Sequence, residues 1–237
     1  MSPPLARVTW TPSWRLISSR FPPAGLFDRV SDPADLEAVF FIEGLTNDRL
    51  RDEAGALSLV PPEDRVAGPG TTPIMAAFTH CNPDGSRFSD GTYGVYYAAY
   101  SIDTAIAETR FHRERFLAMT DEPPLEIDMR AYASEIDCDL HDVRGAHEAR
   151  PEIYDPDPSR YGPAQALARD LRTNGANGIV YDSVRDRGGQ CVAIFRARVL
   201  SPVTQGPHFC YVWDGHAIVQ VYEKRNYEPG ADEFHAL

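Results

Sequence analysis

The stretch that decides the fold spans residues 86–116 and reads SRFSDGTYGVYYAAYSIDTAIAETRFHRERF. Its middle, residues 93–100, has the aromatic and β-branched composition of a buried strand. Ser101 follows directly as a helix N-cap, and Asp103 stands in the first turn, where the helix dipole favours a carboxylate. The apolar residues that come next recur at helical spacing. The stretch therefore predicts a strand that runs into a helix with almost no loop.

Further strands and helices are expected downstream, but they do not alternate regularly. The pattern predicts strands over 125–129, 179–183 and 191–198, a helix over 163–171 and a surface loop over 145–163. Asn174-Gly175 ends the helix, and residues 187–189 turn the chain between the last two strands. Asp214-Gly215, between 209–213 and 217–222, is typical of a two-residue hairpin. This order favours an α+β fold over a doubly wound parallel sheet.

Upstream of the deciding stretch, the chain is rich in aromatic residues and proline. Residues 1–30 are expected to form an extended strand-and-loop lead-in. Asp32 and Pro33 are typical of a helix start, and apolar spacing favours a helix or broken helix pair from Ala34 to about Leu50. Residues 55–73 are expected to be loop. We therefore expect one domain, residues 1–237, with a lead-in and helical extension over 1–80, a core over 81–225 and a frayed tail over 226–237.

Charge and composition exclude several classes of protein. The chain has 23 Lys and Arg against 35 Asp and Glu, a net charge of −12, which disfavours a sequence-independent nucleic-acid binder and a polybasic membrane-surface protein. No apolar segment resembles a secretion signal or a membrane span. None of the four cysteines forms a C-x-x-C pair, and the histidines lack metal-site spacing, so no metal is expected. A cytoplasmic protein with reduced thiols is the default expectation.

Four polar or aromatic residues could carry chemistry, each with an ordinary alternative. Arg87, in a loop before the first core strand, could clamp a phosphate or be a surface arginine. Tyr97 and Glu108 lie on one strand–helix unit that can aim both at one site, where a carboxylate stabilises positive charge; the alternative is an i,i+4 pair of Glu108 with His112. Ser183 could bind a ligand or satisfy a turn.

Together these positions resemble the RES-domain family, named for its Arg, Glu and Ser. The resemblance is carried by residues 86–116 and by NGIVYDSVRDRGGQCVAIF at 177–195. The lead-in WRLISSRFPPAGLFDRV (14–30) and LTNDRLRDE (45–53) are similar to a longer-chain subgroup of the family. One departure is Gly-Ser-Arg-Phe at 85–88, where the family often has Gly-Gly-Arg-Trp.

The resemblance implies a fold and an activity. RES proteins are toxins of bacterial type II toxin–antitoxin pairs with Xre-type antitoxins, and their fold is similar to that of ADP-ribosyltransferase toxins, a mixed or antiparallel β core flanked by helices. They degrade NAD by hydrolysis or phosphorolysis of the nicotinamide–ribose bond, and at least one type ADP-ribosylates a protein. The resemblance thus implies NAD as substrate, inorganic phosphate as a candidate co-substrate, no metal, and a homodimer bound to an antitoxin.

The resemblance also implies roles for individual residues. Arg87, Glu108 and Ser183 would be catalytic: Arg87 would hold an NAD phosphate or the nicotinamide ribose side, Glu108 would bind the ribose and stabilise its positive charge, and Ser183 would hydrogen-bond the ribose or its neighbour. Tyr97 would stack on the nicotinamide.

An arginine of the lead-in would add to the NAD site. Arg15 and Arg20 are the two candidates, and Arg15 is preferred because it follows the aromatic Trp14. Three functions stay open on the same residues: an NAD-degrading toxin, a protein ADP-ribosyltransferase, and an inactive RES-fold binding module. In an acidic protein, an anionic substrate requires local positive charge, so these arginines are expected to gather at the site.

Overall fold

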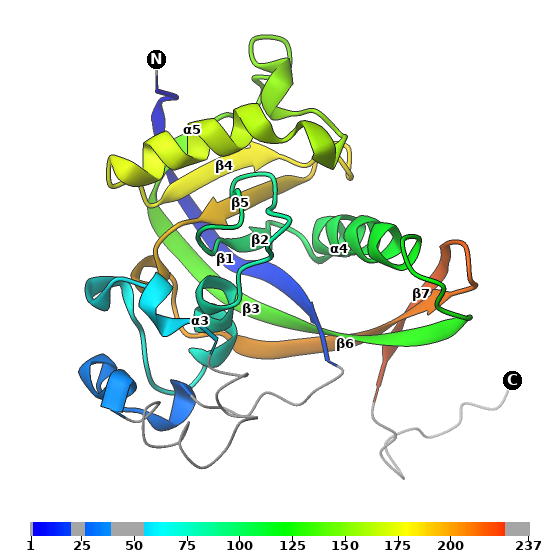
Figure 1. The fold of residues 1–237 in the computed structure, drawn as a ribbon, viewed down its shortest axis with the longest axis horizontal. Coiled ribbons are helices and arrows are strands. Elements are labelled where there is room, and N and C mark those ends of the chain that lie inside the picture. Colours follow the sequence, from blue (N-terminus) through cyan, green and yellow to red (C-terminus); the bar gives the residue numbers. More distant parts are fainter. Residues whose placement is uncertain (1, 20–26, 39–54, 226–237) are drawn as a thin grey trace, which may run out of the picture.

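A computed structural model describes residues 2–19, 27–38 and 55–225 of the chain. The described part is a mixed α/β structure around one seven-stranded, mostly antiparallel sheet in the order β1-β2-β5-β4-β3-β6-β7 (Figure 1). The strands are β1 (Leu5–Ser18), β2 (Tyr96–Ala99), β3 (Leu125–Asp142), β4 (Gly178–Asp182), β5 (Gln190–Ile194), β6 (Thr204–Trp213) and β7 (Ile218–Lys224). The longer helices are α3 (Thr72–Thr79), α4 (Ile102–Leu117) and α5 (Gly162–Thr173). The expected mixture of helices with a mixed or antiparallel sheet is confirmed.

Five of the strands close into a ring. β1 runs antiparallel to β3 from the pair Leu5↔His141 to the pair Ser18↔Met129. β1 also pairs with β2, through Trp14↔Ala99, and β2 is joined through β5 and β4 back to β3. The β3–β4 pairing is the parallel one. The N-terminal strand therefore bonds both ends of the β2-β5-β4-β3 series, while β6 and β7 extend the sheet beyond β3.

Apolar side chains form two clusters on opposite faces of the sheet. Consecutive residues of β2 alternate between them: Tyr96 belongs to the first cluster, whereas Tyr97 packs against the second, as the period of two in a strand requires. Helix α3 packs on the first cluster through Ile74 and Phe78, and helices α4 and α5 cover the second. The second cluster is the one beneath the candidate functional residues.

The expected strand–helix unit is present. Ser101 caps α4, accepting a hydrogen bond from the Thr104 amide at 3.1 Å. The expected stops are also confirmed, because Gly175 after α5 and Gly188 between β4 and β5 both have positive φ. The expected helix start is also present: Asp32 accepts from the Ala34 amide, and a 3-10 turn over 33–35 leads into α-helix at 36–38. The rest of that expected helix, beyond residue 38, and the tail over 226–237 lie outside the described residues.

Three other expectations were wrong. The strand expected over 125–129 continues to Asp142, because its residues alternate between buried and exposed along nearly the whole length. Helix α3 begins at Thr72, at the end of the segment expected to be loop. The β6–β7 connection is longer than a two-residue hairpin, since Trp213 pairs with Ile218 and the Asp214 carboxylate accepts from two backbone amides in the loop.

A buried aspartate joins the N-terminal extension to the core. Asp64, almost fully buried, lies 2.8 Å from Arg196 Nη1 and 3.3 Å from Arg198 Nε. Asp64 belongs to the short helical turn Pro62–Asp64, and the two arginines flank the turn Ala197–Val199 that follows β5. The turn Pro62–Asp64 of the extension is thus tied to the segment that follows β5.

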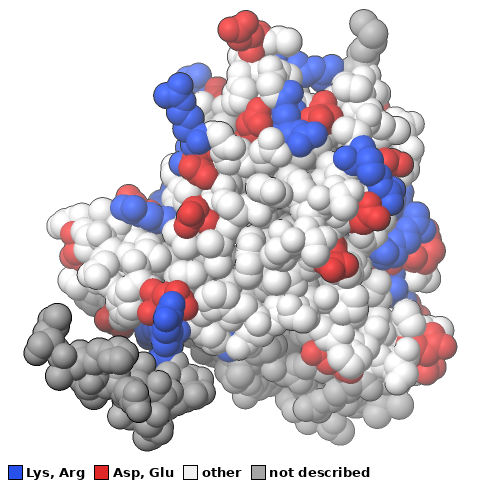
Figure 2. Space-filling view, turned by 180° about the vertical axis from the view of Figure 1, so that it is seen from behind, with Lys and Arg blue, Asp and Glu red and all other residues white. Residues whose placement is uncertain are grey.

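The charged residues show no single-sign patch on the face seen in Figure 2. There, Lys and Arg are interspersed with Asp and Glu, around a broad area without charged side chains (Figure 2). All four cysteines are free thiols. None of the helices in the described part of the chain has the length and apolar character needed to cross a bilayer.

Candidate functional site

Glu108 and Ser183 meet although they come from different elements. Glu108 lies in the second turn of α4, and Ser183 directly follows β4. Ser183 Oγ donates a hydrogen bond of 2.6 Å to Glu108 Oε1. Ser183 Oγ also accepts hydrogen bonds from the backbone amides of Arg185 and Asp186, at 3.0 and 2.9 Å. Ser183 therefore satisfies the turn, as one of the two readings expected, and it also holds the Glu108 carboxylate.

The environment of Glu108 moves its pKa in opposing directions. Burial raises the pKa of this carboxyl group above its ordinary value, and this is the dominant influence. The hydrogen bond from Ser183 and the positive charges of Arg87 and Arg185 favour the ionised form and lower the pKa again. Glu108 is thus a partly dehydrated carboxyl group whose ionised form is disfavoured by burial and favoured by a hydroxyl and two guanidinium groups.

His112, one turn after Glu108 on α4, is not a cationic partner for it. Burial, and after it the positive charges of the nearby arginines, Arg185 first, lower the pKa of His112 to about 4. The imidazole is therefore neutral near pH 7. The alternative of an ordinary Glu108–His112 ion pair is wrong for this structure, in which the carboxylate is hydrogen-bonded to Ser183.

Arg87 is buried rather than a surface arginine. Its Nη1 donates to the backbone carbonyls of Ile153 and Asp155, at 2.7 and 3.1 Å. Its Nη2 donates to the hydroxyl of Tyr161 at 3.2 Å, and the guanidinium carbon lies 4.4 Å from the centre of the Tyr161 ring. All these partners are neutral, and Arg87 makes no ion pair within the described residues. Its positive charge is therefore fixed in place without a carboxylate bonded to it.

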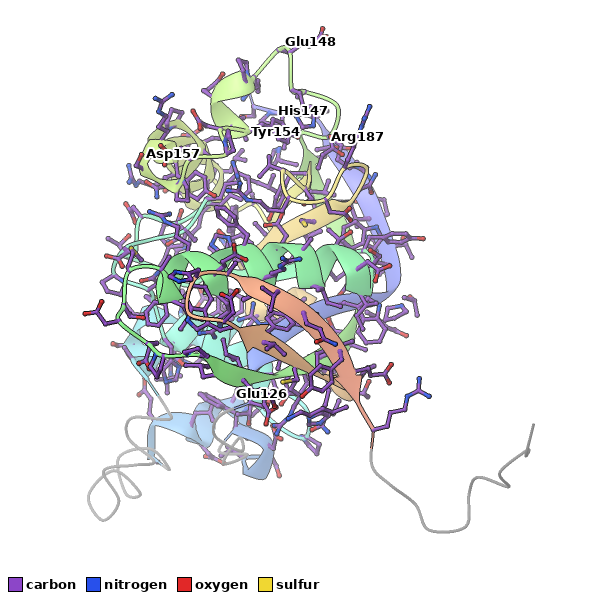
Figure 3. The ribbon with its side chains drawn as sticks, turned by 90° about the vertical axis from the view of Figure 1, so that its right-hand side faces the viewer. Glu126, His147, Glu148, Tyr154, Asp157 and Arg187 are labelled. Carbon is purple, nitrogen blue, oxygen red and sulfur yellow. The ribbon has the colours of Figure 1, made fainter. Side chains whose placement is uncertain are left out.

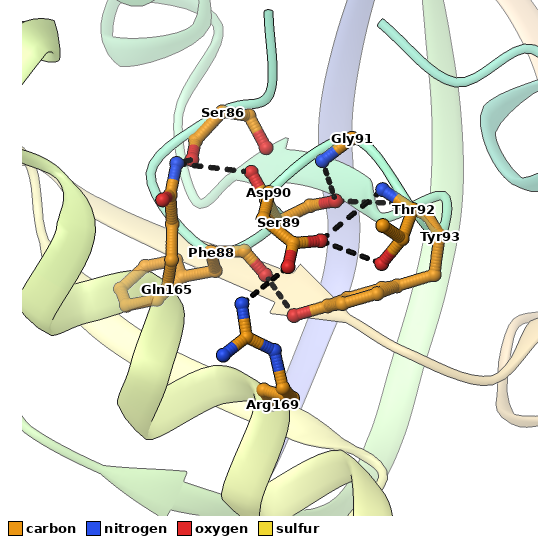
Figure 4. A network of polar contacts seen from close by, with 9 residues as sticks. All are labelled: Ser86, Phe88, Ser89, Asp90, Gly91, Thr92, Tyr93, Gln165 and Arg169. Carbon is orange, nitrogen blue, oxygen red and sulfur yellow. Dashed lines mark hydrogen bonds and ion pairs between the residues drawn. The ribbon is translucent and has the colours of Figure 1, made fainter. Parts of the chain in front are cut away.

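The loop that carries Arg87 is fastened to α5 and to itself (Figure 4). Gln165 Nε2 donates to the carbonyls of Ser86 and Ser89, at 3.0 and 3.2 Å. Arg169 forms an ion pair with Asp90. The hydrogen bond from the Thr92 hydroxyl and the one from Arg169 lower the pKa of Asp90 to about 2, so this contact persists over the physiological pH range. The loop is rigid because it has its own bonds and does not depend on a ligand.

Tyr97 links this loop to β2. Its hydroxyl is 2.7 Å from Ser86 Oγ and accepts from the Phe88 amide at 3.0 Å. The ring is half-buried against the second cluster, and burial raises the pKa of the phenol well above its ordinary value. Tyr97 therefore positions the residues on both sides of Arg87.

The segment that binds Arg87 is itself anchored beside Ser183. His147 Nε2 lies 3.2 Å from Asp182 Oδ2, and the His147 ring stacks on Tyr154 at 3.8 Å between centres (Figure 3). The amide of Gly145 also donates to Asp182 Oδ2, at 2.6 Å. These contacts attach the 143–161 segment to the end of β4. The segment that binds Arg87 is therefore fixed to the strand that Ser183 follows.

The structure places the lead-in arginine at the edge of β2. Arg15 Nη1 donates to the Tyr97 carbonyl at 3.1 Å, and its guanidinium lies 4.8 Å from the centre of the Tyr96 ring. Since Tyr96 and Tyr97 point to opposite faces of the strand, Arg15 is on the other side of β2 from the Tyr97 ring. Its Nε is buried without a hydrogen-bond acceptor, and burial lowers its pKa. Arg20 lies outside the described residues.

Sequence reasoning missed two further residues of the site. Arg185 and Tyr161 both contact the groups around Arg87 and Glu108. Arg185 stands only two residues after Ser183, so its proximity could have been expected from the tight turn. Tyr161 is the residue that directly precedes α5, and no local sequence pattern predicts that it lies in the site. Within the described residues, no group of three or more His, Cys, Asp or Glu side chains is arranged to hold a metal ion.

Comparison with known proteins now identifies the family. The family model described as RES domain matches residues 62–214. The chain belongs to the RES-domain family. It is also 30% identical over 211 residues to "Uncharacterized protein y4oC" of Sinorhizobium fredii, a match that covers 88% of this chain and 86% of that protein. RES domains are found in the toxins of toxin–antitoxin systems, where they are typically paired with an antitoxin.

Proposed function

We propose that this RES-domain protein cleaves NAD at the nicotinamide–ribose bond, as the toxin of a type II toxin–antitoxin pair. The observation that carries the proposal is the Ser183–Glu108 hydrogen bond of 2.6 Å, with Arg87 and Arg185 close enough to lower the Glu108 pKa. It is a combination of one oriented carboxylate and local positive charge in a partly dry site. Such a site suits an anionic substrate in which positive charge develops at one atom.

In the proposed reaction the bond between the nicotinamide nitrogen and the ribose carbon breaks. The bonding electron pair leaves with nicotinamide, which departs neutral, and the ribose carbon and ring oxygen share the positive charge. Glu108 stabilises this charge, more strongly in a low-dielectric site than in water. Ser183 keeps the carboxylate in position. The acceptor then bonds to the ribose carbon and loses its proton to solvent, which yields ADP-ribose with water or ADP-ribose 1-phosphate with phosphate.

Tyr97 and Arg87 have supporting roles in this proposal. Tyr97 presents a half-buried ring on the same face as Glu108, where it offers a shelf for the nicotinamide. Arg87 supplies charge for a phosphate or for the ribose side. Arg15 lies at the edge of β2 and donates to the backbone carbonyl of Tyr97, so it helps to position Tyr97 from the opposite face of the strand. No step in the proposal requires a metal.

The test is release of nicotinamide from NAD by the purified protein, with and without inorganic phosphate. Glu108→Gln is expected to lower the rate by about 10²–10³, the usual loss when one preorganised charged group is removed. Asp103→Asn, an exposed carboxylate on the same helix, is the matched control and should leave the rate unchanged. Full activity of Glu108→Gln would contradict the assignment of the site.

The same assay separates the three functions. Stimulation by phosphate indicates phosphorolysis, and free ADP-ribose without phosphate indicates hydrolysis. Incubation of a cell lysate with NAD labelled in the adenylate part would attach label to a protein if the enzyme is an ADP-ribosyltransferase. No nicotinamide release and no growth arrest on expression would leave an inactive binding module.

We also propose an Xre-type antitoxin partner and a homodimeric toxin. Co-expression of the adjacent antitoxin gene should relieve growth arrest and give a complex that co-purifies. Light scattering on the separated toxin should give twice the mass of one 26.4 kDa chain. The mass of a single chain would contradict the dimer without affecting the proposed activity.

A further inference from the structure

Arg185 is a positively charged residue near Glu108. The reaction proposed above gives Arg185 no contact with the substrate. Its guanidinium carbon lies 3.3 Å from the centre of the Phe111 ring, on α4. Its Nη2 donates to the Pro156 carbonyl and to the Tyr161 hydroxyl, the latter at 3.4 Å. Its Nε is buried and has no hydrogen-bond acceptor. One donor of this guanidinium is therefore held inside the protein without a partner, which carries a free-energy cost.

Two guanidinium groups share one hydroxyl at this place. Arg87 Nη2 and Arg185 Nη2 both donate to Tyr161 OH, at 3.2 and 3.4 Å. Neither arginine forms an ion pair within the described residues; their partners are carbonyls, the hydroxyl and aromatic rings. Like charges this close repel in a partly dry site. Glu108 alone leaves one of the two positive charges uncompensated, so the pair is suited to bind an anion.

The support of Arg185 fixes its distance from Glu108. Phe111, on which the guanidinium stacks, lies three residues after Glu108 on the same helix, so one rigid element carries the carboxylate and the shelf for the cation. In NAD the nicotinamide ribose is joined directly to the diphosphate. A carboxylate at the ribose carbon and a cation pair nearby match that order of groups.

Resting on the proposed function, we propose that Arg185, together with Arg87, binds the diphosphate of NAD, with the Tyr161 hydroxyl spacing the two guanidinium groups. Arg87 is largely occupied by carbonyls, whereas Nη1 of Arg185 has no hydrogen-bond partner among the described residues, so Arg185 makes the added contact with a phosphate oxygen through Nη1. A guanidinium suits this contact because a hydrogen bond between two charged groups is stronger than one between neutral groups. Arg185 is therefore a substrate-binding residue that sequence reasoning did not assign.

The experiment compares Arg185→Ala, Arg185→Lys and the control Arg172→Ala in the full-length protein. Arg172 also stacks on an aromatic ring, Tyr93 at 4.6 Å, but belongs to the last turn of α5 and not to the site. We expect Arg185→Ala to raise KM for NAD about 10- to 100-fold with kcat within about threefold, since a lost charged hydrogen bond is worth roughly that factor. Arg185→Lys should recover part of the loss. The KM for nicotinamide riboside, which lacks the diphosphate, should be the same for the unaltered protein and for Arg185→Ala.

Each other result has a definite meaning. An unchanged KM, or an equal loss of kcat on NAD and nicotinamide riboside, would overturn the inference and assign Arg185 to the charge of Glu108 or to the fold. Loss of soluble protein for Arg185→Ala is checked with Arg185→Lys, whose KM must still rise. If the unaltered protein releases no nicotinamide, the proposed function fails, and binding of ADP-ribose with and without Arg185 tests the diphosphate contact separately.

Discussion

Ser183 Oγ donates to Glu108 Oε1 at 2.6 Å, so a hydroxyl at the end of β4 orients a carboxylate on α4 that is 75 residues earlier in the chain. The hydroxyl is itself fixed by the amides of Arg185 and Asp186. Its lone pairs are thereby engaged and its proton points at the carboxylate. A hydrogen bond donated to the carboxylate favours the ionised form of Glu108 and so opposes the effect of burial on its pKa.

Ser183→Ala should impair catalysis and also change its pH dependence. Removing the hydroxyl removes one of the influences that lower the Glu108 pKa, so the acidic limb of the kcat/KM profile should move to higher pH. We expect kcat/KM near pH 7 to fall about 10- to 100-fold, less than for Glu108→Gln. Ser201→Ala, whose hydroxyl bonds the backbone of Glu135, is the control. A lower rate with an unshifted profile would show that Ser183 does not act through the carboxylate.

Glu108 should make the protein less stable as pH rises. Its pKa in the folded state is above the ordinary value of 4.5, so its favourable contribution is complete below about that pH and is lost as pH rises through the folded-state pKa. Glu108→Gln should therefore be more stable than the unaltered protein at pH 8, with a smaller difference at pH 5. Urea unfolding at the two pH values measures this. Lower stability of Glu108→Gln at pH 8 would contradict the dominance of burial.

His112 should titrate in the opposite sense. Its folded-state pKa of about 4 is below the ordinary value of 6.5, so its contribution to stability is complete above 6.5 and is lost as pH falls toward 4. The linked loss is on the order of 1–3 kcal/mol. Histidine ring signals in NMR should include one with a midpoint near pH 4, and this signal should be missing in His112→Gln. A midpoint near 6.5 for that signal would place His112 in water.

Asp64→Ala should strongly destabilise the fold. It leaves Arg196 and Arg198 without the carboxylate between them, and breaking a buried ion pair from one side costs about 3–5 kcal/mol. Asp137→Ala, which breaks an exposed pair with Arg7, should have a much smaller effect, because solvent screens that pair. Thermal unfolding of the two variants gives the comparison. Equal effects would mean that the N-terminal extension contributes little through this contact.

Local patterns predicted the parts of the site that depend on neighbours in sequence. The cap at Ser101 fixes where α4 begins and thus which face Glu108 occupies, and the Gly-rich turn after Ser183 follows from backbone preferences alone. The full length of β3 was also readable, because acidic residues alternate with buried ones over 135–140, but the acidic composition obscured it.

Contacts between distant segments could not be read in this way. The carbonyls of Ile153 and Asp155 that bind Arg87 belong to a loop with no strand or helix pattern, and any residue type offers a carbonyl. Arg15 was expected to face the site because it follows Trp14. In the structure Arg15 contacts the Tyr96 ring, because consecutive residues of a strand point to opposite faces.

The ring of strands has a consequence for how a newly made chain acquires its site. β1 leaves the ribosome first and finds an antiparallel partner in β3, yet the gap between β2 and β3 is filled only when β4 and β5 have been synthesised. Without β4 and β5 the ring of strands stays open, and Ser183, which directly follows β4, has no fixed place beside Glu108. A translation product that stops before β5 therefore carries the carboxylate and the arginine loop without the closed ring that brings their partners together.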